Sequence, residues 1–476
     1  MRFVNKSDMF IIARNSGMIM IGIGLMCLVP IIVDFVFLEF NVMGYVIPAL
    51  ISIVVGLICI KVFDKYSTSK TRLKHGMITS ALVWLWASII CGLVFYFVTG
   101  INFIDCIFES MSALTGSGIT IYSDVEVLPY SILFFRAFQQ WIGGLGIIVL
   151  IISFLSKPGT TSSRLYQSEA REDRIKPSIK ATIQETLKIY AIYTVAGIIL
   201  YVYAGMPVFD SICHTFSTIS TGGMSVKNAN IGFYHSDLIY FITIILMILG
   251  ATSFLVQYKV IKTRGKSLIR DLQFQVLISI IAGVSLLVYF ISNIVPMEIL
   301  FHVVSAITTT GASIQSPTVM AGWPSNVIII IMTLMLIGGS NGSTVGALKL
   351  MRVITFFKGI YKNLRGILSP NSVINLEISG KKITDELVAE SGNYITLYLI
   401  CILITWILMC SYGHDPFQSL FFTISMQGNV GLEIGQMSQA IELPLKAVGI
   451  FNMWIGRLEI YPVLITFRAF FEIFKR

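Results

Sequence analysis

Ten long apolar stretches dominate this sequence and leave little chain between them for a soluble domain. A bilayer core about 30 Å thick is crossed by a helix of about 20 apolar residues, and each stretch meets or approaches that length. Hydrophobic residues make up 55% of the 476 positions and charged residues only 12%, against roughly 25% charged residues in ordinary soluble domains. We therefore predict an all-helical integral membrane protein with about ten membrane-spanning helices. The stretches lie at about 16–33, 41–60, 76–98, 137–155, 189–209, 238–258, 272–295, 325–348, 391–413 and 447–467.

The placement of the basic residues predicts the orientation. Lys and Arg gather in alternate loops, and the loops between these carry mostly Asp and Glu. Because Lys and Arg stay on the cytoplasmic side, the basic loops and both termini are predicted to lie inside the bacterial inner membrane. The net charge of +9 is then a signal of topology and of contact with anionic lipid, so no nucleic-acid partner is expected. The basic loops hold Lys61, Lys65, Lys70, Arg72 and Lys74, then Lys157–Lys180, Lys259–Arg270 and Lys358–Lys382.

A four-fold internal repeat follows the first two apolar stretches. In each copy a polar residue precedes a glycine by 13 positions, and a serine precedes the same glycine by six. Repetition of this kind is typical of repeated architecture. The glycines are Gly118, Gly223, Gly311 and Gly431, and the serines are Ser112, Ser217, Ser305 and Ser425. The predicted units are an N-terminal two-helix unit at 1–70 and pore repeats at 71–156, 157–265, 266–365 and 366–476.

Each repeat has an amphiphilic segment of about 10 residues between its two apolar spans, which is too short to cross a bilayer as a helix. It fits a half-helix that enters from outside and returns as an extended strand. Non-helical backbone at membrane depth persists only where protein buries it or water lines it. Four such loops around one axis would put backbone carbonyls into a shared pore, as in potassium channels. The alternative is four Gly/Ser/Thr turns outside the membrane, which does not explain the common spacing.

These segments resemble the selectivity-filter loops of the Trk/Ktr/HKT superfamily of cation transporters. The resemblance rests on SALTGSGIT, TISTGGMS, SAITTTGAS and GNVGLEIG, and on QQWIGGLGIIVL (139–150) and IGGSNGSTVGALKLMR (337–352). It spans about residues 8–476, and the two extra N-terminal helices favour the Trk branch. It implies one pore per subunit, a homodimer, a soluble cytoplasmic nucleotide-binding regulatory subunit, and inward movement of potassium. No cofactor is expected on this chain, because potassium is the substrate.

The resemblance also implies the residues of the filter. All four filter positions are glycine, which favours potassium over sodium. The first loop departs from the threonine run common in the family, and the fourth lacks Pro-Gly after its glycine, which leaves the exact selectivity open. The filter residues are Gly116, Ser117, Gly118, Thr221, Gly222, Gly223, Thr309, Thr310, Gly311, Asn429, Val430 and Gly431. Potassium is expected at Gly116, Ser117, Thr221, Gly222, Thr309, Thr310, Asn429 and Val430.

Two further features predict a gate below the filter. Arg457 lies in the middle of the last apolar span, where a charge is costly and usually faces a cavity. In the family an arginine of this segment projects into the pore. An ion pair with a carboxylate of another helix is the alternative. The run GGSNGSTVG interrupts the eighth span and resembles the family's occluding loop, although a glycine-softened helix contact remains open. Its residues are Gly338, Gly339, Ser340, Asn341, Gly342, Ser343, Thr344 and Gly346.

Other function classes fit less well. The sequence contains no HExxH, GxSxG or paired-carboxylate motif, so an enzyme is not expected. A secondary transporter for sodium, ammonium or another cation remains the alternative, and it would not need a four-fold filter repeat. Channel-like flow and coupled symport are both open. Glu433 is either a residue of the outer mouth or a solvated loop carboxylate.

Overall fold

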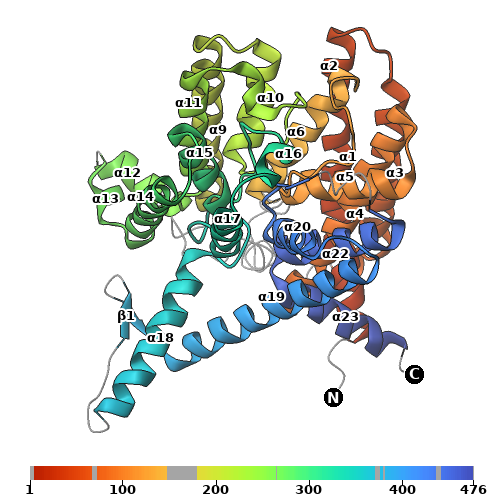
Figure 1. The fold of residues 1–476 in the computed structure, drawn as a ribbon. Coiled ribbons are helices and arrows are strands. Elements are labelled where there is room, and N and C mark those ends of the chain that lie inside the picture. Colours follow the sequence, from red (N-terminus) through yellow and green to blue (C-terminus); the bar gives the residue numbers. More distant parts are fainter. Residues whose placement is uncertain are drawn as a thin grey trace.

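The computed structural model describes residues 5–66, 72–146, 179–263, 265–369, 376–378, 381–435 and 441–474. Within these ranges the chain is almost entirely helical (Figure 1). Six helices there are long and apolar enough to cross a membrane, and the count rises to eight if each of two sharply bent helix pairs is one span. The prediction of an all-helical, multi-pass membrane fold is confirmed.

The N-terminal unit is a helical hairpin that packs beside the first repeat. Its two long helices cross at glycines, because a Cβ atom on Gly17 would lie 2.7 Å from the Gly56 carbonyl oxygen, and one on Gly56 would lie 2.6 Å from that of Gly17. Small residues at such crossings let membrane helices pack closely. The elements are α1 (Lys6–Leu28), α2 (Ile31–Val36), α3 (Val42–Val62) and the short 3-10 helix η1 (Asp64–Tyr66).

Four repeats follow, each with a long first helix, a short pore helix and a second helix. Repeat 1 has α4 (Leu73–Thr99), α5 (Phe103–Thr115) and α6 (Tyr130–Leu145). Repeat 2 has α9 (Ile179–Tyr203), α10 (Val208–Ile219), the 3-10 helix η2 (Asn230–Tyr234), α11 (Asp237–Gly250) and α12 (Phe254–Thr263). Repeat 3 has α13 (Lys266–Arg270), α14 (Leu272–Ile291), α15 (Pro296–Ile307), α16 (Pro317–Ala321), α17 (Ser325–Ile337) and α18 (Leu350–Leu368). Repeat 4 has α19 (Asp385–Ser411), α20 (Pro416–Gly428), α22 (Leu443–Leu458) and α23 (Ile460–Phe474).

A small antiparallel hairpin lies between α18 and α19. Its strands are β1 (Leu376–Ile378) and β2 (Lys381–Ile383), paired with Glu377 opposite Lys382. Leu376, Ile378 and Ile383 form a small apolar cluster there. The hairpin lies beside α18, which projects from the helical bundle together with part of α19 (Figure 1).

The second helices of the repeats are shorter and more broken than the apolar pattern predicts. The expected single spans at 238–258 and 447–467 are each two helices, bent by 106° between α11 and α12 and by 116° between α22 and α23. The expected span at 325–348 ends at Ile337. The hydropathy pattern does not reveal these breaks, because apolar residues continue on both sides of each one. The residues after 146 of the expected span 137–155 lie outside the described residues.

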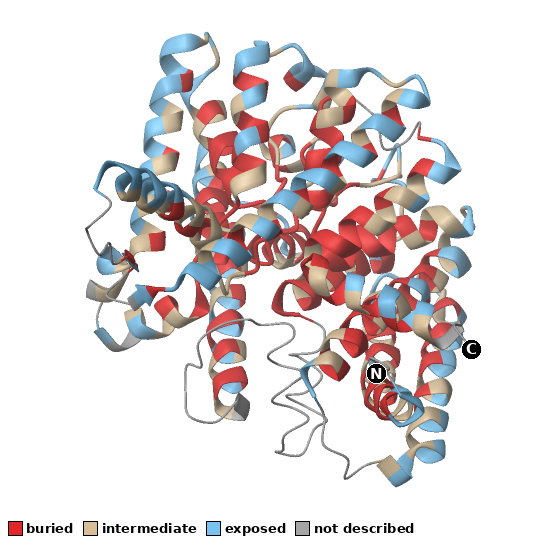
Figure 2. Ribbon diagram, turned by 90° about the horizontal axis from the view of Figure 1, so that it is seen from below, coloured by how far each residue is buried: buried red, intermediate tan, exposed pale blue. Residues whose placement is uncertain are grey.

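Burial is concentrated at the centre of the bundle. Figure 2 shows buried residues gathered in the middle of the view and exposed residues on the helices around them. The C-terminal halves of all four pore helices are buried. Large apolar side chains on the outer helices remain exposed, such as Val54 at 50% and Phe290 at 75%, as expected for surfaces that face lipid.

Candidate selectivity filter and gate

The chain reverses direction after each pore helix through the same backbone hydrogen bond. The N–H of the residue before each filter glycine donates to the carbonyl of the serine found in the repeat. The four bonds are Ser117 to Ser112 at 3.0 Å, Gly222 to Ser217 at 2.8 Å, Thr310 to Ser305 at 2.9 Å and Val430 to Ser425 at 2.9 Å. Because these N–H groups point back to the helix, they do not face the space between the loops.

The serine hydroxyls hold the strand beyond the glycine. In repeats 1 and 3 the hydroxyl donates to the carbonyl one residue past the glycine, from Ser112 to Ile119 at 2.6 Å and from Ser305 to Ala312 at 2.7 Å. In repeat 4 the Ser425 hydroxyl accepts from the N–H of Gly431 at 3.0 Å. The serine spacing in the sequence therefore reflects a fixed turn rather than a side chain in the pore.

Left-handed backbone alternates in the same register in all four loops. Each filter glycine has a positive φ, and so does the residue two positions before it. Alternation of this kind turns successive carbonyls to one side, whereas an extended strand alternates them. The pairs are Gly116 (φ 76°) with Gly118 (73°), Thr221 (53°) with Gly223 (76°), Thr309 (49°) with Gly311 (73°), and Asn429 (51°) with Gly431 (101°).

The four loops close into a ring in chain order. A Cβ atom added to each filter glycine would collide with a carbonyl oxygen of the next repeat. The collisions would be Gly118 with Gly222 at 2.2 Å, Gly223 with Thr310 at 2.0 Å, Gly311 with Val430 at 1.9 Å, and Gly431 with Ser117 at 2.4 Å. Repeat 1 thus contacts 2, 2 contacts 3, 3 contacts 4, and 4 returns to 1. The twelve predicted filter residues are brought together around one centre.

The chemistry at this centre suits a cation. No charged residue is among the twelve filter residues, and the C-termini of the four pore helices end there, where the helix dipole places partial negative charge. Carbonyl oxygens replace the hydration shell of potassium in channels. Two of these carbonyls also accept hydrogen bonds from side chains, Gly222 from Gln140 Nε2 at 2.7 Å and Gly223 from Asn230 Nδ2 at 3.1 Å.

The residues two positions before the filter glycines connect the filter to what lies beneath it. The Thr221 hydroxyl lies 3.0 Å from that of Thr344, and the Thr309 hydroxyl accepts from the Gly346 N–H at 3.0 Å. The Asn429 amide donates to the Ser117 hydroxyl at 2.8 Å. Two of these three side chains therefore bind the interrupted segment of repeat 3.

The interrupted segment, residues 338–349, is an irregular loop between α17 and α18, here called the gate loop. It pairs with the break in repeat 2. The Ser340 N–H donates to the Ala251 carbonyl at 3.1 Å, and the Phe254 N–H donates to the Gly342 carbonyl at 3.1 Å. The helix is therefore broken here and not merely softened by glycine, and the freed backbone groups find partners in protein, as non-helical backbone in a membrane requires.

Arg457 lies beneath the filter and joins three repeats. In the last turn of α22 it donates to the Thr344 carbonyl at 2.6 Å and to the carbonyls of Gly143 at 2.5 Å and Gly144 at 3.0 Å. Its guanidinium lies 5.9 Å from the centre of the Trp84 ring. Arg457 thus binds the gate loop and the end of α6 together.

The sequence did not reveal how the second helices meet the pore helices. In three repeats a glycine of the second helix lies against the carbonyl four residues before the filter glycine. A Cβ atom on Gly143 would lie 1.8 Å from Leu114 O, one on Gly250 would lie 2.8 Å from Ile219 O, and one on Gly456 would lie 2.0 Å from Gln427 O. The feature of the sequence that indicates this packing is the presence of glycines within long apolar spans.

Two buried or partly buried ion pairs were also missed. Glu109 and Arg136 meet at 2.7 Å, with side chains 0% and 2% exposed. Glu109 also accepts from the Ile121 N–H at 3.0 Å, so the pair holds the strand beyond the first filter glycine. Glu459, at the bend between α22 and α23, pairs with Arg352 and lies 3.5 Å from Lys349. A carboxylate in one apolar segment and a cation in another were the only sequence signal.

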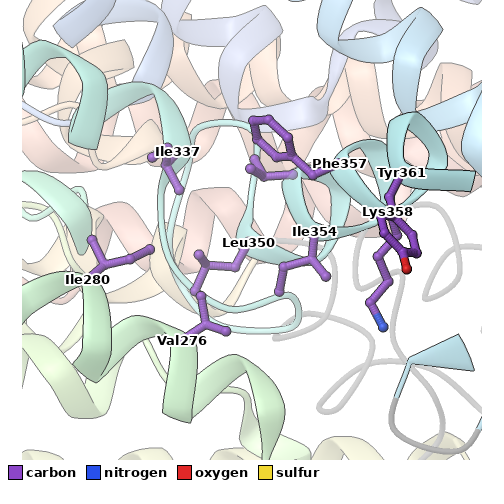
Figure 3. A pocket seen from close by; sticks show the side chains of 9 residues that line it. Val276, Ile280, Ile337, Leu350, Ile354, Phe357, Lys358 and Tyr361 are labelled. Carbon is purple, nitrogen blue, oxygen red and sulfur yellow. The ribbon is translucent and has the colours of Figure 1, made fainter. Parts of the chain in front are cut away.

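An apolar cavity of about 440 Å³ adjoins both ends of the gate loop. Ile337, the last residue of α17, and Leu350, the first of α18, lie on its wall (Figure 3). Val276 and Ile280 of α14 also line it. The ends of the gate loop therefore border an open apolar groove.

The described residues contain no group of three or more His, Cys, Asp or Glu side chains that could hold a metal ion. The His214 and His302 rings are buried in the pore helices, and His302 contacts the Ser313 hydroxyl at 2.9 Å. Glu433 is half-buried, with its Oε1 atom buried. The polar atoms of the twelve filter residues are backbone groups, the hydroxyls of Ser117, Thr221, Thr309 and Thr310, and the Asn429 amide.

Comparisons with known proteins agree with this geometry. The TrkH family profile, described as cation transport protein, matches residues 50–291 and 295–473. An uncharacterized cation transporter of Methanocaldococcus jannaschii is 35% identical over 98% of this chain and 97% of the relative. The Trk system potassium uptake protein TrkG of Escherichia coli is 29% identical over 98% and 99%.

The fold has a solved counterpart as well. The crystal structure of the potassium transporter TrkH from Vibrio parahaemolyticus superposes with a TM-score of 0.85 at 25% identity, covering 96% of this chain and 98% of that one. The matched family is one of transporters and not of enzymes. This chain belongs to the TrkH family of cation transport proteins.

Proposed function

We propose that this protein takes up potassium through the ring of four filter loops. The observation that carries the proposal is the closed contact order of Gly118, Gly223, Gly311 and Gly431, each against a carbonyl of the next repeat. A ring of that kind presents uncharged oxygen ligands of fixed number and spacing, which is how carbonyl filters discriminate between cations. Two relatives named as potassium transporters support the choice of ion.

The potassium ligands are the carbonyls and hydroxyls of the residues that precede the filter glycines. They are Gly116, Ser117, Thr221, Gly222, Thr309, Thr310, Asn429 and Val430. Hydroxyls of Thr308 and Thr310 lie 2.8 Å apart, and those of Thr115 and Ser117 lie 3.0 Å apart. The Thr115 and Thr308 hydroxyls also donate to the carbonyls of Met111 and Val304 in their own pore helices, each at 2.7 Å.

The gate loop and Arg457 form the barrier below the filter. The loop is hydrogen-bonded to filter residues Thr221 and Thr309, and Arg457 is hydrogen-bonded to the loop at Thr344. Opening requires the loop to move away from the pore axis. The apolar cavity next to Ile337 and Leu350 offers space for that movement (Figure 3).

The protein is placed in the cytoplasmic membrane with both termini inside, following the distribution of Lys and Arg. We assign homodimer formation to the exposed apolar face of α18, where Phe357 is 63%, Ile367 76% and Leu368 81% exposed. Because α18 projects from the helical bundle (Figure 1), a second copy of the chain can reach this face. A cytoplasmic nucleotide-binding subunit of the Trk type is the proposed regulator, because relatives are named as parts of a Trk system.

The test is rescue of a potassium-uptake-deficient bacterium, with rubidium and sodium uptake measured in the same cells. Wild type should restore growth at low potassium and take up rubidium, and Gly118→Ser should weaken the preference over sodium because its side chain meets the Gly222 carbonyl. Failure to rescue with the protein present in the membrane would contradict the function. Rescue that no filter substitution alters would contradict the filter.

A further inference from the structure

A second apolar cavity lies at the periphery of the bundle, away from the filter. It has a volume of about 450 Å³. Its walls are Met9–Met20 on α1 and Ile78–Ile89 on α4, and Thr466, Ala469 and Phe470 of α23 close it. Almost all of its lining is hydrocarbon, so it suits an apolar occupant.

The cavity is long and narrow. Each of the stretches Met9–Met20 and Ile78–Ile89 covers eleven residue steps, which is about 16 Å along a helix. This length matches one leaflet of a hydrocarbon core about 30 Å thick. A volume of about 450 Å³ over this length gives a cross-section of roughly 28 Å². A single hydrocarbon chain with carbon contacts at about 4 Å needs roughly 16–20 Å², so the cavity is wide enough for one chain.

The cavity opens toward the bilayer and begins at its basic end. Met9 on α1 and Ile89 on α4 are 36% and 39% exposed, and both helices qualify as membrane spans. Phe470 on α23 is 49% exposed. Cys59, another lining residue, is two positions before Lys61. Lys74 is one helical turn before Ile78. Lys74 is paired with Asp8 at 2.7 Å, so the exposed Lys61 is the cation at this end that complements a phospholipid phosphate.

We propose that this cavity holds one acyl chain of a phospholipid from the leaflet at the basic end. The chain lies between α1 and α4 and beneath α23. Binding itself does not depend on the proposed function. Its effect on transport does, because α23 is joined through the 116° bend to α22, which carries Arg457. An acyl chain in this position supports the orientation of α23 and, through it, the end of α22.

The experiment uses the purified full chain reconstituted with phosphatidylglycerol that carries a diazirine at the end of one acyl chain. After illumination, adducts are mapped by peptide mass spectrometry. Adducts are expected to concentrate on Met9–Met20 and Ile78–Ile89. Ala13→Phe fills the cavity and should lower this yield at least fivefold. Val54→Phe, on the lipid-exposed face of α3 at 50% exposure, should leave it unchanged.

Adducts spread evenly over all lipid-exposed helices would overturn the proposal, because they indicate annular lipid only. So would a concentrated yield that Ala13→Phe does not reduce. Variants are compared only if they elute as the wild type does in size-exclusion chromatography. Ser16→Leu is the second variant, since Ser16 lines the cavity, is 4% exposed and has a hydroxyl without a hydrogen-bond partner. It removes that polar group while filling the same space. The same five-fold reduction is expected.

Discussion

Replacing Arg457 should raise the cation flux, and the magnitude follows from its position. Arg457 Nη2 bonds Gly143 O, and Gly143 packs against Leu114 O at the base of the first filter loop. For an order-of-magnitude estimate, we take a separation of about 8 Å between this charge and a cation at the inner end of the filter. Two like charges about 8 Å apart at an effective dielectric constant of about 20 repel by about 2 kcal/mol. Removing the charge should therefore raise the rate about 30-fold.

Three variants separate the charge from the hydrogen bonds. Arg457→Ala removes both, Arg457→Gln keeps an amide donor for the carbonyls without the charge, and Arg457→Lys keeps the charge without the planar fork. The assay is rubidium uptake into proteoliposomes at equal protein content. The Ala and Gln variants should take up rubidium faster than wild type. The uptake rate of the Lys variant should stay within about threefold of the wild-type rate.

Two outcomes would contradict this prediction, and they have different meanings. If Lys is as fast as Ala, the barrier depends on the hydrogen-bonded clamp on Thr344, Gly143 and Gly144 rather than on the charge. If Ala is no faster than wild type while the protein remains folded, Arg457 is not part of the barrier.

Three further substitutions test other parts of the account. Gly311→Ala adds a Cβ atom 1.9 Å from Val430 O at φ 73°, so it should displace that carbonyl and weaken the preference for rubidium over sodium, as Gly118→Ser should at the Gly222 carbonyl. Gly100→Ala at φ 70° meets nothing within 4 Å, should cost only about 1–2 kcal/mol of strain, and should keep the wild-type preference. An equal preference in the Gly311→Ala and Gly100→Ala variants would argue against the ring. Thr344→Val removes the hydroxyl that contacts Thr221 and Gly250, worth about 1 kcal/mol, and should raise the basal leak several-fold. Thr333→Val on the exposed face of α17 is its control, and an unchanged leak would show that the hydroxyl does not hold the loop. Glu459→Gln removes the carboxylate that pairs with Arg352 and Lys349 and should destabilise the protein by about 3 kcal/mol or more. The measurement is the melting temperature in detergent, which should fall. An unchanged melting temperature would mean that the ion pair is dispensable.

The repeat was the part of the pore that the sequence could predict. The spacing between Ser112 and Gly118, and its three counterparts, reports a turn that each loop must make in the same way. The positive φ at each filter glycine follows from that turn, because glycine adopts it without steric strain. A repeated local constraint leaves a mark in one sequence, and a ring is a simple way to arrange four equal loops.

The breaks in the second helices and the contacts between repeats could not be predicted in this way. Residues around Gly250 and Glu459 remain apolar enough to read as continuous spans, and the bends depend on packing against other repeats. The partners of Arg457 are backbone carbonyls of Thr344, Gly143 and Gly144, which every residue possesses. No pattern of side chains marks a carbonyl as a partner, so the arginine could be singled out but its contacts could not.

Cation competition in proteoliposomes tests the central claim most directly. Rubidium uptake by the wild-type chain is measured against increasing external potassium, caesium, sodium, lithium and ammonium. A four-repeat carbonyl filter for potassium predicts that potassium competes at least about tenfold more strongly than sodium, a difference of about 1.4 kcal/mol or more, and that Gly118→Ser reduces this ratio. Equal competition by potassium and sodium, or a ratio that Gly118→Ser leaves unchanged, would contradict the account.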